Sequence, residues 1–369
     1  MKRVLILGGA GFIGSHTADL LYSKGYQITI LDNLHHKNHY NSWPEYLNKE
    51  FKLVKGDVTD RNILTKLISE NDYIYHFAAE MDLSPEFHKF IDVNVSSTAL
   101  IYEIITKNNF VIKKIIIASS QFVYGEGRWI SIENKEFYPP NRTKEQMLLR
   151  KWEILDSSGN DAKYIYSEED QLVNPPNHYA ISKYFQEQLA LKLGKLYDIK
   201  TVCMRYSIVH GPRQSLKNTY SGALRTFAFS CIANIPYATF EDNNSLRDFV
   251  SVFDVAEANR IVLELDAADF EIFNVGGNEV YSVYDLANMV SEYFGKILQF
   301  NSSVEFRLGD IRHAISNCDK LKKLGWCPIH KEKDTVSQYL EWFKIQKPDI
   351  NNFLKIQELI RKQGVVLKA

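Results

Sequence analysis

The sequence predicts an α/β protein built around a doubly wound parallel sheet, and two observations lead to that fold class. Short apolar runs alternate with longer helix-like segments along the first half of the chain, which is typical of strands joined by crossover helices. The first run, residues 4–7, is apolar at every position and indicates a strand covered on both faces. A smaller mixed α/β cap is expected from the rest of the chain.

The composition excludes several classes of protein. The chain has 369 residues, 45% hydrophobic and 24% charged, so it can bury a sizeable core. Its formal net charge of −1 gives no general attraction to nucleic acid or to an anionic membrane. No apolar run reaches the roughly 18 residues of a membrane helix, and the N-terminus resembles a core strand rather than a signal peptide. We therefore expect a cytoplasmic protein with no nucleic-acid or membrane partner.

Cysteines and histidines give no sign of a metal centre. The four cysteines form no CxxC pair and no disulfide-like framework, which favours a reducing compartment. His35, His36 and His39 lie close together, so metal binding is one interpretation of that segment. No second group of ligands accompanies them, and we expect a solvated loop and no metal.

Glycines follow the first strand at the spacing of a dinucleotide-binding turn. Gly8 permits a tight turn, Gly11 lets backbone N–H groups approach a pyrophosphate, and Gly14 lets the next helix pack close to the strand. That helix is expected over residues 15–24, with its N-terminus directed at the anion. A structural glycine turn in another α/β protein is the alternative interpretation.

Asp32 supplies the second part of this pattern. It follows the next apolar strand, residues 27–31, at the distance where an acidic side chain accepts hydrogen bonds from an adenosine ribose. A carboxylate there would bind the ribose 2′-hydroxyl and repel a 2′-phosphate, so we expect NAD rather than NADP. No arginine lies next to Asp32, although His35 and Lys37 are close.

The elements that follow continue the alternation. Small residues after the fourth strand, Ala78 and Ala79, would let a flat ring system lie across the strand end. In a doubly wound sheet the ligand lies at the carboxyl ends of the strands. Strands are expected over 51–55, 73–77, 113–119 and 199–206. Helices are expected over 85–108 and 178–197. A further helix is expected to end near Glu70, with Thr59 or Asp60 as its N-terminal cap.

Tyr179 and Lys183 lie four residues apart on the last of these helices and so share one face. A tyrosine, with a reference pKa of about 10, is a poor base at neutral pH. A lysine ammonium beside it would favour the phenolate, as would a positively charged nicotinamide ring. With Ser120 at the end of the fifth strand, this pattern indicates hydride and proton chemistry. A surface Tyr–Lys pair is the alternative.

An ordered set of motifs extends this interpretation over residues 2–345. The chain resembles the extended short-chain dehydrogenases/reductases of the nucleotide-sugar epimerase and dehydratase group. The resemblance implies a Rossmann-type domain, NAD as cofactor, a nucleotide-diphosphate sugar as substrate, and a homodimer. The motifs are GGAGFIG (8–14), DNL (32–34), GDVTD (56–60), HFAA (76–79), SSQFVYG (119–125), YAISK (179–183), RYSIVHGPRQ (205–214), RDFVSVFDVA (247–256), FNVGG (273–277) and RLGDIRH (307–313).

The resemblance also implies a role for individual residues. The catalytic residues would be Ser120, Tyr179 and Lys183. Arg247 and Arg307 would hold the substrate diphosphate, for which arginines are the natural clamp, although surface ion pairs remain the alternative for both. The implied NAD contacts are Gly8, Gly11, Phe12, Ile13, Gly14, Asp32, Asn33, Asp57, Val58, Phe77, Ala78, Ala79, Asn94, Tyr179 and Lys183. The implied substrate contacts are Ser120, Gln121, Tyr179, Arg213, Arg247 and Arg307.

The expected domain organisation is discontinuous. The NAD-binding domain would comprise residues 1–205, with 248–277 returning to its sheet. The substrate-binding cap would comprise 206–247 and 278–347, including a helix at 319–324, and a terminal amphipathic helix would lie within 348–369.

An insertion of about residues 126–174 makes the chain between Tyr124 and Tyr179 more than twice as long as the resemblance implies. It resembles an insertion in enzymes similar to dTDP-L-rhamnose 4-epimerase, some of which carry paired cysteines there. This segment contains no cysteine, so we expect no zinc. A short helix is expected over 148–155. The insertion is either a lid over the sugar or a packed surface excursion.

Two features of the resemblance leave questions open. Many relatives have Phe-Asn where this chain has Ser207-Ile208, and Tyr where it has His210. The missing asparagine removes an amide that commonly meets the substrate, so the sugar and the base stay unassigned. The helices over 85–108 and 178–197 carry apolar faces, which would form either a dimer interface or intramolecular core. These faces are Ile101, Ile104 and Ile105 on one helix and Phe185, Leu189 and Leu193 on the other.

The leading hypothesis is a 4-epimerase that oxidises the sugar at carbon 4 and returns hydride to the other face. A 4,6-dehydratase would need a further acid and base, for which similar dehydratases use an Asp-Glu pair directly after the catalytic Ser or Thr. Gln121 and Phe122 stand at those positions. Glu126 lies beyond a turn, which leaves Glu80 as the one substitute, although a structural or cofactor-shell role is the favoured interpretation of Glu80. A non-catalytic dinucleotide sensor is a third possibility, but it would be free to lose the Ser–Tyr–Lys set.

Overall fold

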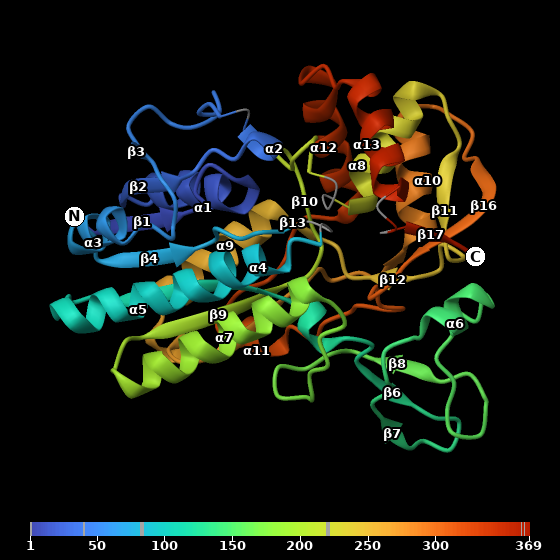
Figure 1. The fold of residues 1–369 in the computed structure, drawn as a ribbon, viewed down its shortest axis with the longest axis horizontal. Helices are drawn as coiled ribbons and strands as arrows, with labels where there is room; N and C mark the ends of the chain where they lie inside the picture. The colour runs from blue at the N-terminus through green and yellow to red at the C-terminus, as the bar shows by residue number, and fades with distance from the viewer. Residues whose placement is uncertain (1, 40, 82–84, 219–221, 363, 365) are drawn as a thin grey trace.

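Seven parallel strands form the main sheet, in the order β14-β9-β5-β4-β1-β2-β3. The computed structural model of the chain describes residues 2–39, 41–81, 85–218, 222–362, 364 and 366–369. The predicted doubly wound parallel sheet is confirmed (Figure 1). The strands are β1 (Arg3–Leu7), β2 (Gln27–Asp32), β3 (Lys52–Lys55), β4 (Tyr73–His76), β5 (Lys114–Ser120), β9 (Thr201–Tyr206) and β14 (Ile272–Val275).

Strand β1 illustrates why the sheet needs cover on both sides. Val4 and Ile6 belong to one hydrophobic core and Leu5 and Leu7 to another, because successive side chains of a strand point to opposite faces. The helices α1 (Phe12–Ser23) and α9 (Val252–Glu264) cover the first face, and α3 (Arg61–Ser69), α5 (Ser97–Asn108) and α7 (His178–Leu196) cover the second.

The helix over 85–108 forms in three parts. These are α4 (Phe87–Phe90), the π-helical turn η1 (Ile91–Ser96) and α5. π-Helical turns are rare and occur often at functional sites. Asn94 lies on η1 and is fully buried.

Of the two apolar faces proposed for a dimer, one is intramolecular. Ile101, Ile104 and Ile105 are buried in the core under the second face of the sheet. They pack against neighbouring helices and the sheet, so they are not available to a partner subunit. On α7, Leu193 packs partly against the same core, whereas Phe185 is 51% exposed.

The cap lies beside the carboxyl ends of the main strands (Figure 1). Its sheet pairs β11 (Tyr237–Phe240) in parallel with β16 (Phe300–Arg307), which pairs antiparallel with β17 (Val366–Lys368). Four helices pack with it: α8 (Gly222–Ala233), α10 (Val283–Tyr293), α12 (Glu332–Ile345) and α13 (Ile350–Lys362). The terminal helix joins this core through Phe353, whose ring stacks on that of Phe229 with centroids 4.6 Å apart.

Two segments lie elsewhere than expected. The segment 248–252 does not pair with the main sheet: β13 (Val250–Ser251) pairs with β10 (Val209–His210) as a separate two-stranded sheet. The helix expected in the cap is α11 (Asp319–Lys322), and its Leu321 is buried in the first core of the main sheet. Both corrections arise because such short segments carry no signal of which sheet they contact.

The insertion folds as a small sheet with one helix. Its strands are β6 (Arg128–Ile130), β7 (Glu136–Phe137) and β8 (Lys163–Ile165), and its helix is α6 (Lys144–Leu148). The helix expected over 148–155 is wrong in position. Thr143 caps a helix that begins earlier, its Oγ1 accepting from Gln146 N at 3.2 Å, and Arg150 adopts a φ of 54°, which ends it.

The remaining described elements are short. They are α2 (His36–His39), η2 (Gln121–Tyr124), β12 (Leu246–Arg247), η3 (Asp266–Ala268) and β15 (Tyr281–Ser282). None of the helices in the described part of the chain is long and apolar enough to cross a membrane.

Candidate active site

A cavity of about 2170 Å³ lies where the main sheet meets the cap. Its lining includes the glycine turn, the ends of β2, β4, β5 and β9, and cap residues on α8, β11 and β16. A pocket for one small ligand is usually about 300–1,000 Å³. This cavity therefore has room for two ligands side by side, one against the sheet and one against the cap.

The glycine turn forms a cradle that side chains would fill. Gly8 has a φ of +78°, and a Cβ there would lie 2.6 Å from the backbone N of Ala78. A Cβ on Gly14 would lie 2.5 Å from the carbonyl oxygen of Gly8. Gly11 precedes α1, and Phe12 and Ile13 line the cavity with it, so the helix N-terminus borders the space. This arrangement fits a pyrophosphate.

Asp32 lies in the cavity wall with its carboxylate already oriented. Its oxygens accept from the backbone N–H groups of Ala10 at 3.1 Å and Leu34 at 2.9 Å. Burial raises the pKa of this carboxyl above its usual value, against the opposing effects of His39 and the two backbone donors. A carboxylate has about four lone-pair positions, so about two remain on Asp32 to accept hydrogen bonds from the two hydroxyls of a ribose.

The other residues proposed to contact NAD divide into two groups. Asn33 and Asp57 line the cavity and bond each other, Nδ2 to Oδ2, at 3.0 Å, and Val58, Phe77, Ala78 and Ala79 also line it. Asn94 is not among the described lining residues. Its amide instead bonds Glu80 N at 2.8 Å, Glu80 O at 3.1 Å and Ser182 Oγ at 2.8 Å. Asn94 thus holds the backbone after β4 in place.

The structure brings Ser120, Tyr179 and Lys183 together on the cavity wall. Ser120 ends β5 and hydrogen-bonds Tyr179, which lies in the first turn of α7. One turn later, Lys183 is buried and its Nζ donates to Gln186 Oε1 at 2.7 Å.

Electrostatics at this site differ from the expectation that Lys183 keeps Tyr179 acidic. Burial raises the pKa of Tyr179 to about 12, and the hydrogen bond with Ser120 lowers it only in part. Burial also lowers the pKa of Lys183 to about 7. The polypeptide by itself therefore favours the neutral phenol, and further positive charge in the cavity is needed to make it a base.

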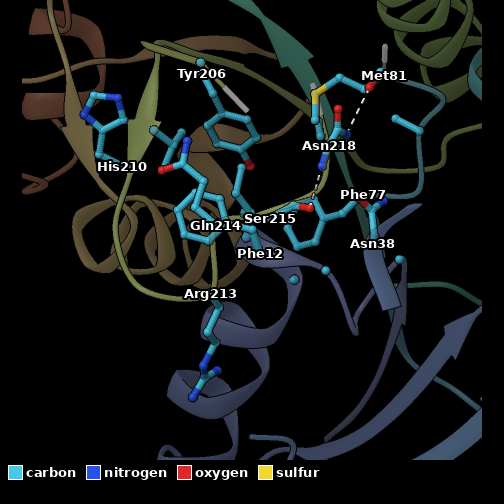
Figure 2. Close-up of a pocket in the computed structure, with 18 of the residues that line it drawn as sticks. Phe12, Asn38, Phe77, Met81, Tyr206, His210, Arg213, Gln214, Ser215 and Asn218 are labelled. Atoms are coloured by element: carbon cyan, nitrogen blue, oxygen red, sulfur yellow. Dashed lines mark hydrogen bonds between the residues drawn. The ribbon is translucent and has the colours of Figure 1, made fainter. Parts of the chain in front are cut away.

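The residues proposed to bind substrate occupy different environments. Arg307 lines the cavity with its guanidinium 4.7 Å from the Phe240 ring centroid. Arg213 also lines the cavity, but its side chain extends away from the other labelled residues (Figure 2). Its guanidinium pairs with Asp19, on α1, at 2.7 Å. Gln121 is buried outside the described lining, and its Oε1 accepts from Ser207 Oγ at 3.1 Å and Ser316 Oγ at 3.3 Å.

Arg247 lines the cavity with its guanidinium held by backbone carbonyls. Nη1 donates to the oxygens of Leu246 at 2.8 Å and Arg312 at 3.0 Å, and Nη2 donates to that of Ile311 at 3.0 Å. The head group is thus oriented by neutral acceptors rather than by a carboxylate at bonding distance, since its Asp310 contact is 3.8 Å. Its positive charge remains available to an anion.

Sequence reasoning missed two residues of this site, Asn177 and Asn218. Asn177 caps α7, its Oδ1 accepting from Ala180 N at 2.9 Å, and its Nδ2 donates to the Gly309 carbonyl at 2.9 Å. An asparagine directly before a helix is a capping signal that could have found the first contact. Asn218 donates to the Met81 carbonyl at 3.1 Å (Figure 2), a contact that no local pattern signals.

The insertion is not a lid in this structure. In the described cavity lining, no residue lies between Phe122 and Asn177. Glu126 is 1% exposed and is held by Arg142 at 2.8 Å, away from the cavity. Glu80, by contrast, does line the cavity. Among the described residues, no group of three or more His, Cys, Asp or Glu side chains could hold a metal ion.

Known proteins share both the fold and the sequence pattern. One family model, described as GDP-mannose 4,6 dehydratase, matches residues 5–142, and another, described as NAD dependent epimerase/dehydratase family, matches residues 157–276. The chain is 30% identical over 349 residues to a dTDP-L-rhamnose 4-epimerase of Burkholderia thailandensis, covering 92% of this chain and 94% of the relative. It is also 30% identical over 349 residues to a putative UDP-glucose 4-epimerase of Methanocaldococcus jannaschii, covering 92% of this chain and 98% of the relative.

A solved structure supports the same relationship. The UDP-glucose 4-epimerase of Thermotoga maritima, determined with UDP-glucose, matches with a TM-score of 0.75 and 26% identity over 93% of this chain and 99% of that one. Fold and site together define a dinucleotide-binding protein of the short-chain dehydrogenase/reductase class. The chain belongs to the NAD-dependent epimerase/dehydratase family, and the resemblance noted from its motifs is confirmed.

We predict that the protein binds NAD at least about tenfold more tightly than NADP, because a 2′-phosphate would approach the buried Asp32 carboxylate. Titration calorimetry with both dinucleotides measures this difference. Asp32→Asn removes the charge and should reduce the difference in affinity between NAD and NADP. Equal or tighter binding of the phosphorylated cofactor by the wild-type protein would contradict the assignment.

Proposed function

We propose that this protein is an NAD-dependent nucleotide-sugar epimerase that acts at carbon 4 of the sugar. The observation that carries this proposal is the shared cavity. Ser120, Tyr179 and Lys183 line it together with the glycine turn and Asp32, while Arg247 and Arg307 line it from the cap. A dinucleotide on the sheet and a nucleotide sugar under the cap would meet at Tyr179.

Each residue of this site has a separate proposed role in the reaction. NAD, when bound, supplies a hydride acceptor and donor and a positive charge near Tyr179. That charge opposes the effect of burial, so Tyr179 can take the proton from the sugar hydroxyl and later return it. Ser120, which hydrogen-bonds Tyr179, holds the reacting oxygen. Lys183 orients the cofactor ribose. Once the sugar has lost its carbon 4 hydride, the planar ketone would turn over within the cavity, and return of that hydride to the other face would invert the carbon.

The arginines support a diphosphate-linked substrate. Arg247 presents a charge whose orientation depends on backbone carbonyls, and Arg307 lies over Phe240 at the same cavity. Guanidinium groups match the paired oxygens of a diphosphate. Arg213, paired with Asp19, is better placed to support the α1 side of the cavity than to hold substrate.

A 4,6-dehydratase is the second candidate, since one matching family model bears that description. Three observations count against it. Gln121 points to Ser207 and Ser316, Phe122 cannot exchange a proton, and Glu126 is paired with Arg142. Glu80 lines the cavity and remains the residue that a dehydratase would have to use.

The function is tested by incubating the protein with a panel of nucleotide sugars and following the products by NMR and mass spectrometry. We expect two epimers of equal mass to interconvert, with no net redox change, because the cavity lacks the additional acid–base pair at positions 121 and 122. Loss of water from a 6-hydroxy hexose would overturn the epimerase assignment and identify Glu80 as the base to mutate.

Tyr179→Phe should lower turnover by at least about 10²-fold, because it removes the group that exchanges the proton. Binding of a nucleoside diphosphate should be nearly unchanged, since the diphosphate contacts lie in the cap. Tyr102→Phe is a matched control: its hydroxyl bonds Thr201 at 2.6 Å in the core beneath the sheet. If Tyr179→Phe keeps more than a tenth of the wild-type rate, Tyr179 is not the base.

We infer that the protein forms a homodimer through α4, η1 and α7. Apolar side chains are exposed there: Phe87 by 58%, Ile91 by 41%, Ile181 by 40% and Phe185 by 51%.

All four cysteines are free, which supports a reducing, cytoplasmic setting.

Phe185→Lys should convert the dimer to monomer in sedimentation experiments, because a charge would be buried in an apolar interface. Ile345→Lys, on the cap helix α12 and 74% exposed, is the matched control and should leave the dimer intact. A wild-type monomer, or a dimer unaffected by Phe185→Lys, would disprove this interface.

A further inference from the structure

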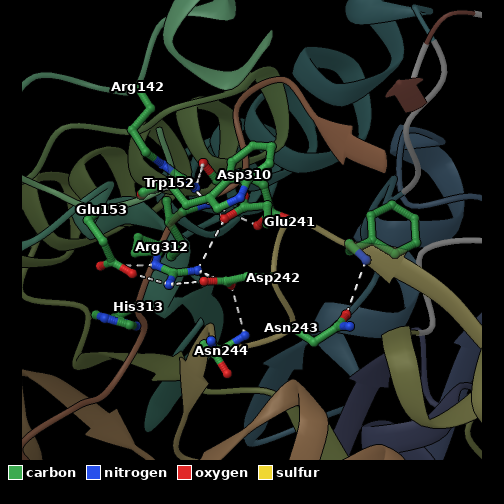
Figure 3. A network of polar contacts seen from close by, with 12 residues as sticks. Arg142, Trp152, Glu153, Glu241, Asp242, Asn243, Asn244, Asp310, Arg312 and His313 are labelled. Atoms are coloured by element: carbon green, nitrogen blue, oxygen red, sulfur yellow. Dashed lines mark hydrogen bonds and ion pairs between the residues drawn. The ribbon is translucent and has the colours of Figure 1, made fainter. Parts of the chain in front are cut away.

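A cluster of ion pairs around two buried arginines, Arg142 and Arg312, joins the insertion to the cap loop that follows Arg307 (Figure 3). The mechanism proposed above does not use this cluster. It contacts the loop whose carbonyls, those of Ile311 and Arg312, accept hydrogen bonds from Arg247. We call it the arginine cluster, and its members are Glu126, Arg142, Glu153, Glu241, Asp242 and Arg312.

Arg142 connects three separate parts of the chain. Within the insertion, its Nε donates to Glu126 Oε1 at 2.8 Å and its Nη1 to the Trp152 carbonyl at 3.3 Å. Nη1 also donates to Glu241 Oε2, at the end of β11, at 2.8 Å. Nη2 donates to the Asp310 carbonyl at 3.3 Å. The side chain is 2% exposed, so water cannot replace these contacts easily.

Other members of the arginine cluster bond the same loop at Arg312. Glu126 Oε2 accepts from the backbone N of Arg312 at 2.8 Å. The Arg312 side chain forms a two-pronged pair with Asp242, at 2.7 and 2.8 Å, and a further pair with Glu153 of the insertion. The backbone of 310–312 is therefore fixed at Asp310 by Arg142 and at Arg312 by Glu126.

This fixed backbone is the one that orients Arg247. The carbonyls of Ile311 and Arg312 accept from the Arg247 guanidinium, both at 3.0 Å. At its other end the loop is tied to the catalytic helix, since Asn177 Nδ2 donates to the Gly309 carbonyl at 2.9 Å. Burial disfavours the charge of Arg142, but Glu126 and Glu241 outweigh that effect and hold its pKa above the usual value.

We propose that Arg142 is a positioning residue for the substrate diphosphate: it fixes the 310–312 backbone, whose carbonyls aim the Arg247 guanidinium into the cavity. The insertion then acts on substrate binding from outside the cavity. This inference rests on the proposed function, because it takes Arg247 to bind the diphosphate.

A purely structural role for Arg142 predicts a different result. Loosening of the insertion alone would lower thermal stability without a selective effect on one ligand. The positioning role predicts weaker binding of the diphosphate at the cap and unchanged binding of NAD at the sheet. Arg128 provides a matched control, because its ion pairs with Glu136 and Glu168 stay within the insertion.

The test compares wild type, Arg142→Met and Arg128→Met by titration calorimetry with UDP, dTDP and NAD. We expect Arg142→Met to weaken binding of the preferred nucleoside diphosphate about tenfold, with NAD affinity unchanged and KM raised more than kcat is lowered. Arg128→Met should bind all three ligands as wild type does. Wild-type diphosphate binding by a cooperatively unfolding Arg142→Met protein, or equal losses for NAD and diphosphate, would overturn the proposal.

Arg142→Lys keeps the test decisive if Arg142→Met does not fold. Lysine retains the charge but lacks the planar fork that reaches Glu126, Glu241 and Asp310 together. We expect a smaller loss of diphosphate affinity in the same direction, and an unchanged affinity would count against the positioning role. Failure of the wild-type protein to bind either diphosphate would instead refute the proposed function.

Discussion

The parallel direction of the seven main strands is the constraint on which the rest of the structure depends. It brings the carboxyl ends of β1, β2, β4, β5 and β9 to one edge of the sheet. The turn after β1 then lies against the chain after β4, so closely that a Cβ on Gly8 would overlap Ala78. Glycine at one end and alanine at the other allow a cavity to form where bulkier residues would fill the space.

The same edge also sets the relation between the sheet and the cap. Asn177 is one of the residues that join them, since its amide caps the helix that carries Tyr179 and also bonds the loop that follows Arg307. The helix that carries Tyr179 and the loop that follows Arg307 therefore share one side chain.

Burial opposes charge at the centre of the site. It raises the pKa of Tyr179 to about 12 and lowers that of Lys183 to about 7, so neither group is strongly charged by the polypeptide alone. Between the insertion and the cap the balance is different, because the buried Arg142 of the insertion is matched by two carboxylates, Glu126 and Glu241. The ion pairs around Arg142 therefore keep their charge, whereas burial keeps Tyr179 neutral in the polypeptide alone.

Local pattern was enough for the features that depend on neighbouring residues. Apolar runs located the main strands, the glycine spacing located the turn, and the four-residue spacing placed Tyr179 and Lys183 on one face of α7. Of the two residues expected to cap the third helix, Thr59 and Asp60, the structure shows Asp60 in that role, because its carboxylate accepts from Asn62 N at 2.9 Å. These features follow from backbone geometry and periodicity, which a sequence carries directly.

Tertiary contacts decided the rest. Gln121 and Asn94 carry side chains that suit ligand binding, yet both bond to protein groups, because residues distant in sequence fold against them. The placement of α11 on the main sheet and the cluster around Arg142 depend on similar long-range contacts. Sequence by itself therefore determined the fold class, the dinucleotide turn and the Ser–Tyr–Lys set. Only the folded chain determined which polar side chains face the cavity, because that depends on partners that no local pattern specifies.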